Sequence, residues 1–483
     1  MILRELKRPA ERSEVKNMPV AYSLGRGRFP LFQSTVHKDR EIKENSIYAY
    51  IPSTTGRMVH SSPCRVLVSI NRLCFFAVFG NMIHAANICQ RKSERKKRCF
   101  SMKVLITTDL YATNTNGVVT SVRNLMEELE KKGHEVRVLT VSEKLRSHKE
   151  NNIYYIKSVS LGVIYPDVRM PISYRHRYLR ELISWKPDVI HSQCEYFSYQ
   201  FAGYISKKTA APIVHTYHTL YEQYVTYIFP SQKLGSYFVG FLSKFRLRKA
   251  DAIVAPTPKV ETALKNYGVH NPIHVIPSGI ALEQHKERIT EAERQEKRKA
   301  LGIPEDHTVL LNLGRLGTEK NLTELIELFS FALSHHRKLT MLIVGDGPAR
   351  HELEELSEKL GVSENVVFTG MVDPSEVHKY YQLGDIFVSA STSETQGLTY
   401  VEAAANGLPL LCRRDPCLDG VLVEGENGYE YEAEQEFCEL LDTILNNPDW
   451  CRAAGMQSAK IAESFDKSQF ATKIEDVYEA VKR

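Results

Sequence analysis

The stretch Asp385-Ile386-Phe387-Val388-Ser389, followed shortly by Ser393-Glu394-Thr395-Gln396-Gly397-Leu398-Thr399-Tyr400-Val401-Glu402, decides the fold. Its first five residues predict a short buried strand, and the Ala-rich run 400–405 predicts a helix. A strand that leads through a glycine turn into a helix is how α/β sheets present ligands at a crevice. The N-terminus of such a helix offers unpaired N–H groups and a partial positive charge, and both suit a phosphate group.

Two carboxylates flank this glycine turn. Glu394 lies in the loop before the helix, and Glu402 lies on its second turn. A carboxylate just upstream of an anion site can accept hydrogen bonds from sugar hydroxyls, and one just downstream can hold a ribose. The alternative is that Glu394 caps the helix and Glu402 is a solvated surface residue, so the neighbouring motifs must decide.

Length and charge divide the chain. Its 483 residues are too many for one core and predict at least two domains. Residues 1–101 contain 19 Lys and Arg but 7 Asp and Glu, a net charge of +12, whereas residues 102–483 carry a net charge of −7. The mildly acidic body gives no general case for binding nucleic acid.

The first hundred residues differ in character from the rest. Sustained periodicity begins with the strand pattern Lys103–Thr108, so we interpret 1–101 as a poorly ordered basic extension upstream of a natural start at Met102. A membrane anchor at Val66–Cys89 is the competing interpretation, since about 20 residues span a bilayer. Arg72 and several amides make that span costly.

The cysteines after Met102 form no framework. They are scattered, odd in number and without metal-site spacing, which predicts reduced thiols in the cytoplasm. They are Cys194, Cys412, Cys417, Cys438 and Cys451.

Two series of strands alternate with helices, which predicts two doubly wound parallel sheets, each with helices on both faces. A pause at Ile276–Ile280 suggests a hinge, and two such domains would face a cleft at the carboxyl ends of their strands. We expect an N-terminal acceptor-binding domain at 102–277, a C-terminal nucleotide-sugar domain at 278–464, and a helix at 465–483 that packs back toward the first domain. The expected strands are Lys103–Thr108, Glu135–Thr140, Asp188–His191, Pro212–Thr216 and Asp251–Ala255, then Thr308–Leu313, Thr340–Val344, Val366–Thr369, Asp385–Ser389 and Leu408–Leu411.

A basic loop leaves the first strand of the second series. Gly314 allows close backbone approach, and Arg315 and Lys320 flank the turn that opens the next helix. A guanidinium and an ammonium beside a helix N-terminus can cradle a diphosphate, although an exposed turn with incidental charges remains the alternative. Gly345-Asp346-Gly347-Pro348 is expected to be a mainly structural turn.

The first domain offers a glycine and a histidine. Gly117 opens a helix after the first strand, but its loop is no Gly-x-Gly-x-x-Gly fingerprint, which argues against a nicotinamide or flavin enzyme. His218 follows a strand's carboxyl end, where chemistry sits in such folds, whereas His215 is expected to be structural. An Asp-x-Asp motif after a strand is missing, so no metal site is predicted and a divalent metal would only be stimulatory.

As a set, Gly117, His218, Gly314-Arg315-x4-Lys320 and Glu394-x7-Glu402 resemble the retaining glycosyltransferases of family 4, which have the GT-B fold. The resemblance implies that Arg315 and Lys320 bind the donor diphosphate, Glu402 the ribose and Glu394 the hexose. It places the backbone at Gln396-Gly397-Leu398 against sugar and phosphate, and His218 near the reacting centre. Asn321 stands where many members have Gly, which we expect to be tolerated.

Within the family, the sequence looks most like bacterial 1,2-diacylglycerol 3-glucosyltransferases. Residues 233–249 mix basic and aromatic residues without an acidic one, which is typical of a helix that lies on anionic lipid, or else of a core-facing helix with a solvated basic face. An apolar stripe that includes Tyr221 and Tyr224 could guide acyl chains or belong to the core. The acceptor or membrane candidates are Tyr221, Tyr224, Phe238, Phe241, Lys244, Arg246 and Arg248.

The resemblance therefore implies a hexosyltransferase that moves glucose from UDP-glucose to diacylglycerol, making a glycolipid at the inner face of the plasma membrane. The alternatives are a phosphatidylinositol mannosyltransferase or a soluble polysaccharide transferase, and, from another class, a non-catalytic nucleotide-sugar-binding protein. No cofactor beyond the nucleotide sugar is expected.

Overall fold

The computed structural model describes residues 101–111, 117–144, 146–160, 169–173, 175–223 and 232–482. The predicted extension up to residue 100, the candidate span Val66–Cys89 and Tyr224 lie outside these residues. All of the described residues belong to one compact unit, residues 87–483.

A largely parallel sheet organises the first domain. In the described residues its strands run in the order β3-β4-β2-β1-β6-β7-β8-β9, with β5 paired to β4. Of these described strands, only β3 and β5 run antiparallel to their neighbour β4. The strands are β1 (Lys103–Thr107), β2 (Glu135–Ser142), β3 (His148–Glu150), β4 (Ile153–Ser160), β5 (Arg169–Pro171), β6 (Val189–Ser192), β7 (Ile213–Thr216), β8 (Ala252–Ala255) and β9 (Ile273–Val275).

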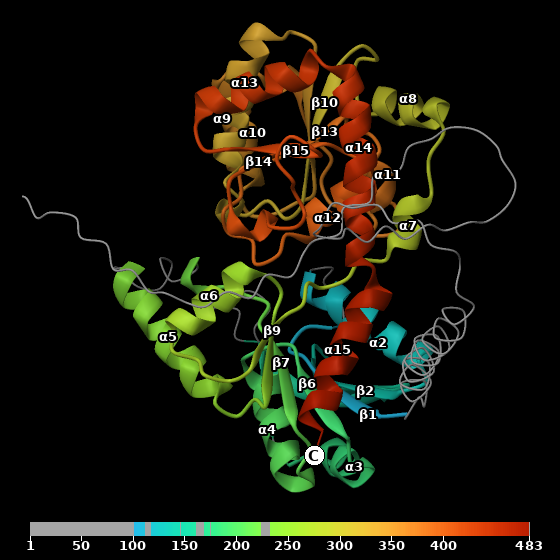
Figure 1. Cartoon of the computed structure of the whole chain (residues 1–483), viewed down its shortest axis with the longest axis vertical. Helices are drawn as coiled ribbons and strands as arrows, with labels where there is room; N and C mark the ends of the chain where they lie inside the picture. Colours follow the sequence, from blue (N-terminus) through green and yellow to red (C-terminus); the bar gives the residue numbers. More distant parts are fainter. Residues whose placement is uncertain are drawn as a thin grey trace, which may run out of the picture. The chain divides into compact units, whose positions relative to one another are not determined.

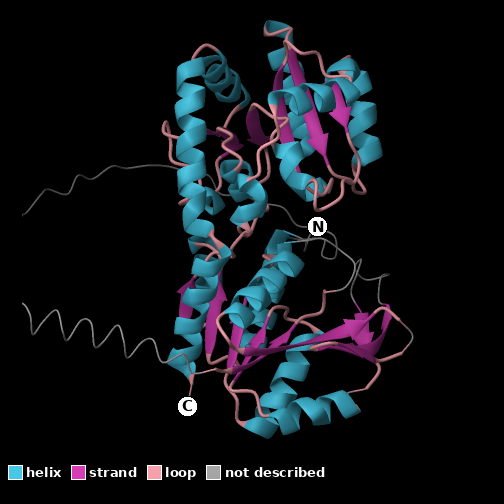
Figure 2. Ribbon diagram, turned by 90° about the vertical axis from the view of Figure 1, so that its right-hand side faces the viewer, coloured by secondary structure: helices cyan, strands magenta, loops and turns pink. Residues whose placement is uncertain are grey.

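Helices cover both faces of this sheet because its central strands are apolar on both sides. Figure 2 shows helices on both faces of the sheet. Val104 and Ile106 of β1 pack in one cluster with Leu125 of α2, whereas Leu105 packs in the opposite cluster with Phe201 of α4. The helices are α2 (Gly117–Lys131), α3 (Arg177–Trp185), α4 (Phe197–Thr209), α5 (Gln232–Leu247) and α6 (Pro258–Asn266).

The second domain has an all-parallel sheet of its own. Within the described chain its order is β12-β11-β10-β13-β14-β15. Figure 1 labels β10, β13, β14 and β15 of this sheet. The strands are β10 (Thr308–Leu313), β11 (Leu339–Val344), β12 (Val366–Phe368), β13 (Ile386–Ser389), β14 (Leu410–Arg413) and β15 (Gly428–Tyr431). The helices are α7 (Leu282–Lys286), α8 (Glu291–Ala300), α9 (Leu322–His335), α10 (Arg350–Lys359), α11 (Val377–Tyr381), α12 (Leu398–Ala405), α13 (Glu434–Leu445) and α14 (Pro448–Ala462).

The last helix, α15 (Lys467–Val481), belongs to the core of the first domain. Phe470, Ile474 and Tyr478 are buried in the same cluster as β1 and α2. The Tyr478 hydroxyl lies 2.7 Å from His191 Nδ1 on β6, and the Nε2 of that imidazole lies 2.7 Å from Thr216 Oγ1 on β7. The chain therefore returns to its first sheet after completing the second.

The prediction of an α/β fold with two doubly wound parallel sheets is confirmed. Each expected strand is present within two residues of the predicted bounds, while β3, β4, β5, β9 and β15 were not predicted. None of the helices in the described ranges is both long enough and apolar enough to cross a membrane.

Candidate active site

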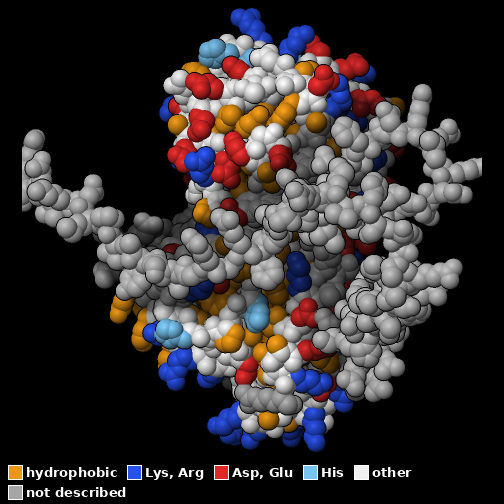
Figure 3. All heavy atoms as spheres, viewed as in Figure 1, with side chains coloured by type: hydrophobic (Ala, Val, Ile, Leu, Met, Phe, Trp, Pro, Cys, Tyr) orange, Lys and Arg blue, Asp and Glu red, His pale blue; other side chains and the backbone are white. Residues whose placement is uncertain are grey.

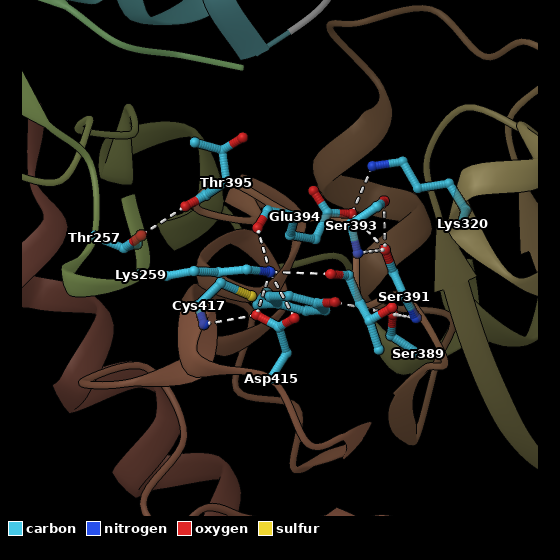
Figure 4. Close-up of polar contacts among 12 residues, drawn as sticks. Thr257, Lys259, Lys320, Ser389, Ser391, Ser393, Glu394, Thr395, Asp415 and Cys417 are labelled. Atoms are coloured by element: carbon cyan, nitrogen blue, oxygen red, sulfur yellow. Dashed lines mark hydrogen bonds and ion pairs between the residues drawn. The ribbon is translucent and has the colours of Figure 1, made fainter. Parts of the chain in front are cut away.

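The two motifs of the second domain meet in an ion pair. Lys320 ends the short helix η3 (Thr318–Lys320) after β10, and its Nζ lies 2.5 Å from Oε1 of Glu394 (Figure 4). Ser391 Oγ donates to the same carboxylate oxygen over 3.2 Å. The structure thus brings together the residue expected at the diphosphate and the residue expected at the hexose, although 74 positions separate them in sequence.

The loop that carries Arg315 is held by backbone hydrogen bonds to residues 344 and 346. Gly314 N donates to Val344 O over 2.9 Å, and Leu316 N donates to Asp346 O over 3.0 Å. A Cβ on Gly345 would lie 1.9 Å from Gly314 O, so only glycine allows this approach. Among the described residues the exposed Arg315 guanidinium has no hydrogen-bond or ion-pair partner, and a cation on a fixed loop is available to an anion.

Asn321 occupies a left-handed position, with φ of 54°, between η3 and α9. Glycine adopts this conformation without strain, and asparagine is among the few other residues that do so readily. Asn321 can therefore hold this turn without the strain that most other side chains would cause.

The N-termini of two helices, one from each domain, lie side by side. Gly397, with φ of 69°, precedes α12, and a Cβ on Gly117 at the start of α2 would lie 3.5 Å from Leu398 Cδ1. The Gln396 side chain is occupied elsewhere, since it pairs with the backbone N and O of Ser278 at 2.8 and 2.9 Å. Gln396 therefore offers its backbone, not its side chain, to a ligand, and both helix dipoles favour an anion there.

Glu402 lies partly buried on α12. The Tyr381 hydroxyl donates to its Oε2 over 2.8 Å. Burial raises the pKa of Glu402 to about 7, and the Tyr381 hydrogen bond only partly opposes that rise. Near neutral pH this carboxyl can therefore exist in either protonation state, and its ionised form only accepts hydrogen bonds.

His218 follows β7 as expected, and it is held by Gln193. Its Nε2 lies 2.7 Å from Gln193 Oε1, an acceptor, so Nε2 carries the proton and Nδ1 keeps a lone pair. Burial lowers the pKa of His218 to about 4, with Glu195 opposing the shift and His215 adding to it. The imidazole is therefore neutral at physiological pH.

Three further residues of this site were missed from the sequence: Gln193, Glu195 and Tyr381. Glu195 accepts from the Tyr221 hydroxyl over 2.7 Å and lies 3.3 Å from His215 Nε2. Gln193 and Glu195 follow the carboxyl end of β6, the same positional signal that pointed to His218, so they could have been found. Tyr381 carries no comparable signal.

Helix α5 exposes a row of large apolar side chains, so it is not the core-facing helix of the alternative interpretation. Phe241 is 61% exposed, and hydrophobic side chains gather with Lys and Arg at the lower left of Figure 3, over this helix. The exposed apolar residues are Tyr237, Phe238, Phe241, Leu242 and Phe245, which we call the aromatic face, and Lys244, Arg248 and Lys249 are exposed beside it.

Two of the acceptor or membrane candidates, Arg246 and Tyr221, form hydrogen bonds inside the first domain. Arg246 donates from Nη1 to the carbonyls of Glu195 and Tyr196, at 2.7 and 3.3 Å. Tyr221 is partly buried against the core cluster beneath α5, with its hydroxyl on Glu195. These two residues attach α5 and η1 (Tyr221–Gln223) to the loop after β6 and so connect the aromatic face to the His218 region.

In the part of the chain that the structure describes, no group of three or more His, Cys, Asp or Glu residues could hold a metal ion.

Both domains match known protein families. Residues 115–284 match the family described as Glycosyltransferase Family 4, and residues 293–461 match the family described as Glycosyl transferases group 1. The alpha-monoglucosyldiacylglycerol synthase of Streptococcus pneumoniae is 34% identical over 351 residues, which cover 72% of this chain and 79% of that protein. The synthase of the same name from Acholeplasma laidlawii is 30% identical over 391 residues, covering 78% of this chain and 96% of its own.

Solved structures share the fold. Anabaena HepE, solved in complex with UDP and glucose, superposes with a TM-score of 0.62 at 17% identity, covering 78% of this chain and all of that one. WaaG, a glycosyltransferase involved in lipopolysaccharide biosynthesis, has a TM-score of 0.58 at 19% identity, covering 78% of this chain and 99% of its own.

Proposed function

Because this chain belongs to glycosyltransferase family 4 and has the GT-B fold, we propose that it transfers glucose from UDP-glucose to the free hydroxyl of diacylglycerol, with retention at the anomeric carbon. One observation carries the choice of acceptor and sugar: two relatives at 34% and 30% identity are both named alpha-monoglucosyldiacylglycerol synthase. The donor is supported by the UDP and UDP-glucose complexes of a structural neighbour.

The donor site is assigned to the second domain. Arg315 and Lys320 bind the diphosphate, Glu402 the ribose and Glu394 the hexose, with the backbone N–H groups at the start of α12 facing phosphate. In the structure the Lys320 ammonium and the Glu394 carboxylate form an ion pair. An incoming diphosphate competes for the Lys320 ammonium, and the Glu394 carboxylate is then available to accept from hexose hydroxyls.

The reaction exchanges one bond at the anomeric carbon for another. The bond from C1 to the UDP oxygen breaks, a bond from C1 to the acceptor oxygen forms on the same face, and the acceptor proton passes to the departing phosphate. Arg315 and Lys320 stabilise the charge that develops on the leaving diphosphate, which is usually the largest contribution to such catalysis. Neutral His218, with its free Nδ1 lone pair, orients the acceptor hydroxyl or donor sugar.

We assign acceptor delivery to α5. A diacylglycerol hydroxyl lies at the membrane surface, and the aromatic face with its neighbouring cations suits the interface of an anionic bilayer. Arg246 and Tyr221 link that surface to the loop that holds His218. The proposal therefore places the enzyme peripherally on the cytoplasmic side of the plasma membrane.

The decisive experiment offers a panel of radiolabelled nucleotide sugars to the protein with diacylglycerol in phosphatidylglycerol vesicles. A glucolipid formed from UDP-glucose, with an α-linkage by NMR, is the expected product. Transfer of the label to phosphatidylinositol or to a soluble glycan would show that the acceptor is that molecule and not diacylglycerol. UDP binding with no UDP release in the presence of any acceptor would contradict catalysis altogether.

A further inference from the structure

Two residues at the start of α6, in the first domain, reach the loop of the second domain that carries Glu394. Lys259 Nζ donates to Thr392 O over 2.9 Å and to Glu394 O over 3.1 Å, and it pairs with Asp415 at 2.6 and 2.8 Å (Figure 4). Thr257 Oγ1 donates to Thr395 O over 2.8 Å. We call these contacts the α6 latch.

The side chains of Thr257 and Lys259 do not stabilise α6, the helix to which they belong. Thr257 stands at the N-cap of α6, where a hydroxyl usually accepts from the first turn, yet its side chain makes no such bond. Lys259 stands in the first turn, where the helix dipole disfavours a cation. The Lys259 side chain is 16% exposed and that of Asp415 is 5% exposed. The side chains of Thr257 and Lys259 thus bond to the second domain and do not stabilise the N-terminus of α6.

The points of attachment surround Glu394. The latch binds the carbonyls at 392, 394 and 395, while the Glu394 carboxylate is held from the other side by Lys320 and Ser391. Figure 4 shows Lys259 and Thr257 approaching this loop from one side and Lys320 from the other. The orientation of the Glu394 backbone therefore depends on a side chain of the other domain.

We propose that Lys259 is a positioning residue, which fixes the Glu394 loop and makes the geometry of the hexose site depend on the seating of the first domain. The inference rests on the proposed role of Glu394 toward the donor hexose. It deepens that role by naming what keeps the carboxylate in place. The latch forms no hydrogen bond with the side chains assigned to the nucleotide portion of the donor, which are Arg315, Lys320 and Glu402.

The test separates positioning from stability with three variants. Lys259→Met removes the cation that pairs with the buried Asp415 carboxylate, and an unpaired buried charge destabilises the fold. Asp415→Asn removes that charge but keeps an oxygen for its hydrogen bond from Cys417 N. The double variant K259M/D415N therefore regains stability while still lacking the contacts to Thr392 O and Glu394 O.

Lys265→Met is the matched control. Lys265 lies on the same helix, but within the described residues its Nζ pairs only with Glu261 of α6, over 2.7 Å, and its side chain is exposed. K265M is expected to behave as wild type in every measurement.

The measurements are the unfolding midpoint in urea, the Kd values of UDP and UDP-glucose, and the transfer rate to diacylglycerol. In the double variant we expect a stability near that of wild type, an unchanged Kd for UDP, weaker binding of UDP-glucose, and a kcat lower on the order of 10²-fold, as for a misplaced reacting group. Recovery of kcat together with stability in the double variant would show that Lys259 is merely structural, and it would overturn the inference.

Amide hydrogen exchange over 392–396 decides the question without a substrate. Faster exchange in K259M/D415N but not in K265M supports the latch, and unchanged exchange overturns it. If the wild-type protein makes no product from UDP-glucose, the proposed function fails, and the exchange experiment still tests the latch.

Discussion

Lys320 Nζ and Glu394 Oε1 lie 2.5 Å apart, so the expected ligand of the diphosphate is the counter-ion of the expected ligand of the hexose. The pair is mostly shielded, with side-chain exposures of 28% and 16%. A donor that carries both a diphosphate and a hexose can satisfy both side chains at once, whereas UDP alone must leave the Glu394 carboxylate without its cation. We therefore expect the sugar and the phosphate to bind with positive coupling.

Lys320→Met is expected to reduce kcat about 10²–10³-fold, because one cation that stabilises the leaving group is lost. Glu394→Gln should weaken UDP-glucose binding more than UDP binding, since the ionised acceptor of the hexose is replaced. Steady-state kinetics and calorimetry of both ligands measure these effects. Lys338→Met, which removes an exposed 2.8 Å pair with Asp306, serves as the control and should leave rates unchanged. Near-normal turnover in K320M would remove Lys320 from the site.

Glu402→Gln should abolish a pH dependence of nucleotide affinity. Burial raises the pKa of Glu402 to about 7, so below pH 7 the wild-type carboxyl is increasingly protonated and accepts ribose hydroxyls less well. The Kd of UDP should rise toward tenfold per pH unit below 7 in the wild type and stay flat in E402Q. Because the folded pKa exceeds the ordinary value of 4.5, the wild-type protein also loses stability as pH rises from 4.5 through 7, and E402Q should lack that loss. An identical Kd profile in both proteins would contradict the assignment to ribose.

The double variant Phe241→Ser/Phe245→Ser should release the protein from vesicles. The two side chains are 61% and 58% exposed on α5, so their replacement leaves the core intact. Each buried Phe is worth about 1.5–3 kcal/mol, so binding to phosphatidylglycerol vesicles should weaken by tenfold or more in a sedimentation assay. Phe331→Ser, on α9 at 46% exposure, is the matched control. Equal sedimentation of both variants would exclude α5 as the membrane contact.

Gln193→Glu should shift the acid limb of the pH–activity profile upward. A carboxylate beside Nε2 favours the imidazolium form of His218, whose pKa burial now lowers to about 4. If neutral His218 is required, activity should be lost at a higher pH in the variant than in the wild type. An unshifted acid limb would mean that the charge of His218 does not matter to the reaction, and NMR titration of the imidazole would verify the pKa change itself.

Asn321→Gly should leave stability and rate nearly unchanged, whereas Asn321→Val should destabilise the protein. A β-branched residue at φ of 54° is a conformational outlier, and the left-handed region costs an ordinary residue roughly 1–2 kcal/mol. Urea unfolding measures the difference. A stable and active N321V protein would show that this turn can adopt another conformation.

Local patterns in the sequence were enough to predict ten of the parallel strands, whereas the parallel strands β4, β9 and β15 were missed. The central strands are short apolar runs followed by helices, and β10 (Thr308–Leu313) was predicted with its observed bounds. The short strands β3 and β5 were missed because each pairs antiparallel with β4 at one edge of the sheet, outside the βαβ repeat. Antiparallel additions of this kind have little periodicity to reveal them.

Contacts between the domains could not be predicted from the sequence. Lys259 and Asp415 are 156 positions apart, and neither residue stands in a recognisable motif. Arg246 illustrates the opposite error: it was grouped with the lipid-facing cations by composition, but its guanidinium binds the carbonyls of Glu195 and Tyr196. Composition gives the charge of a helix, whereas the direction of each side chain depends on packing.

The position of α15 has a consequence for biosynthesis. The cluster around β1 and α2 is closed by Phe470, Ile474 and Tyr478, and a ribosome makes these residues only after the whole second domain. Until then the nascent first domain exposes one apolar face of its sheet and lacks the Tyr478 partner of His191. The first domain therefore cannot complete its folding before the second domain has been translated. A nascent chain that still lacks α15 exposes an apolar surface that a chaperone can bind.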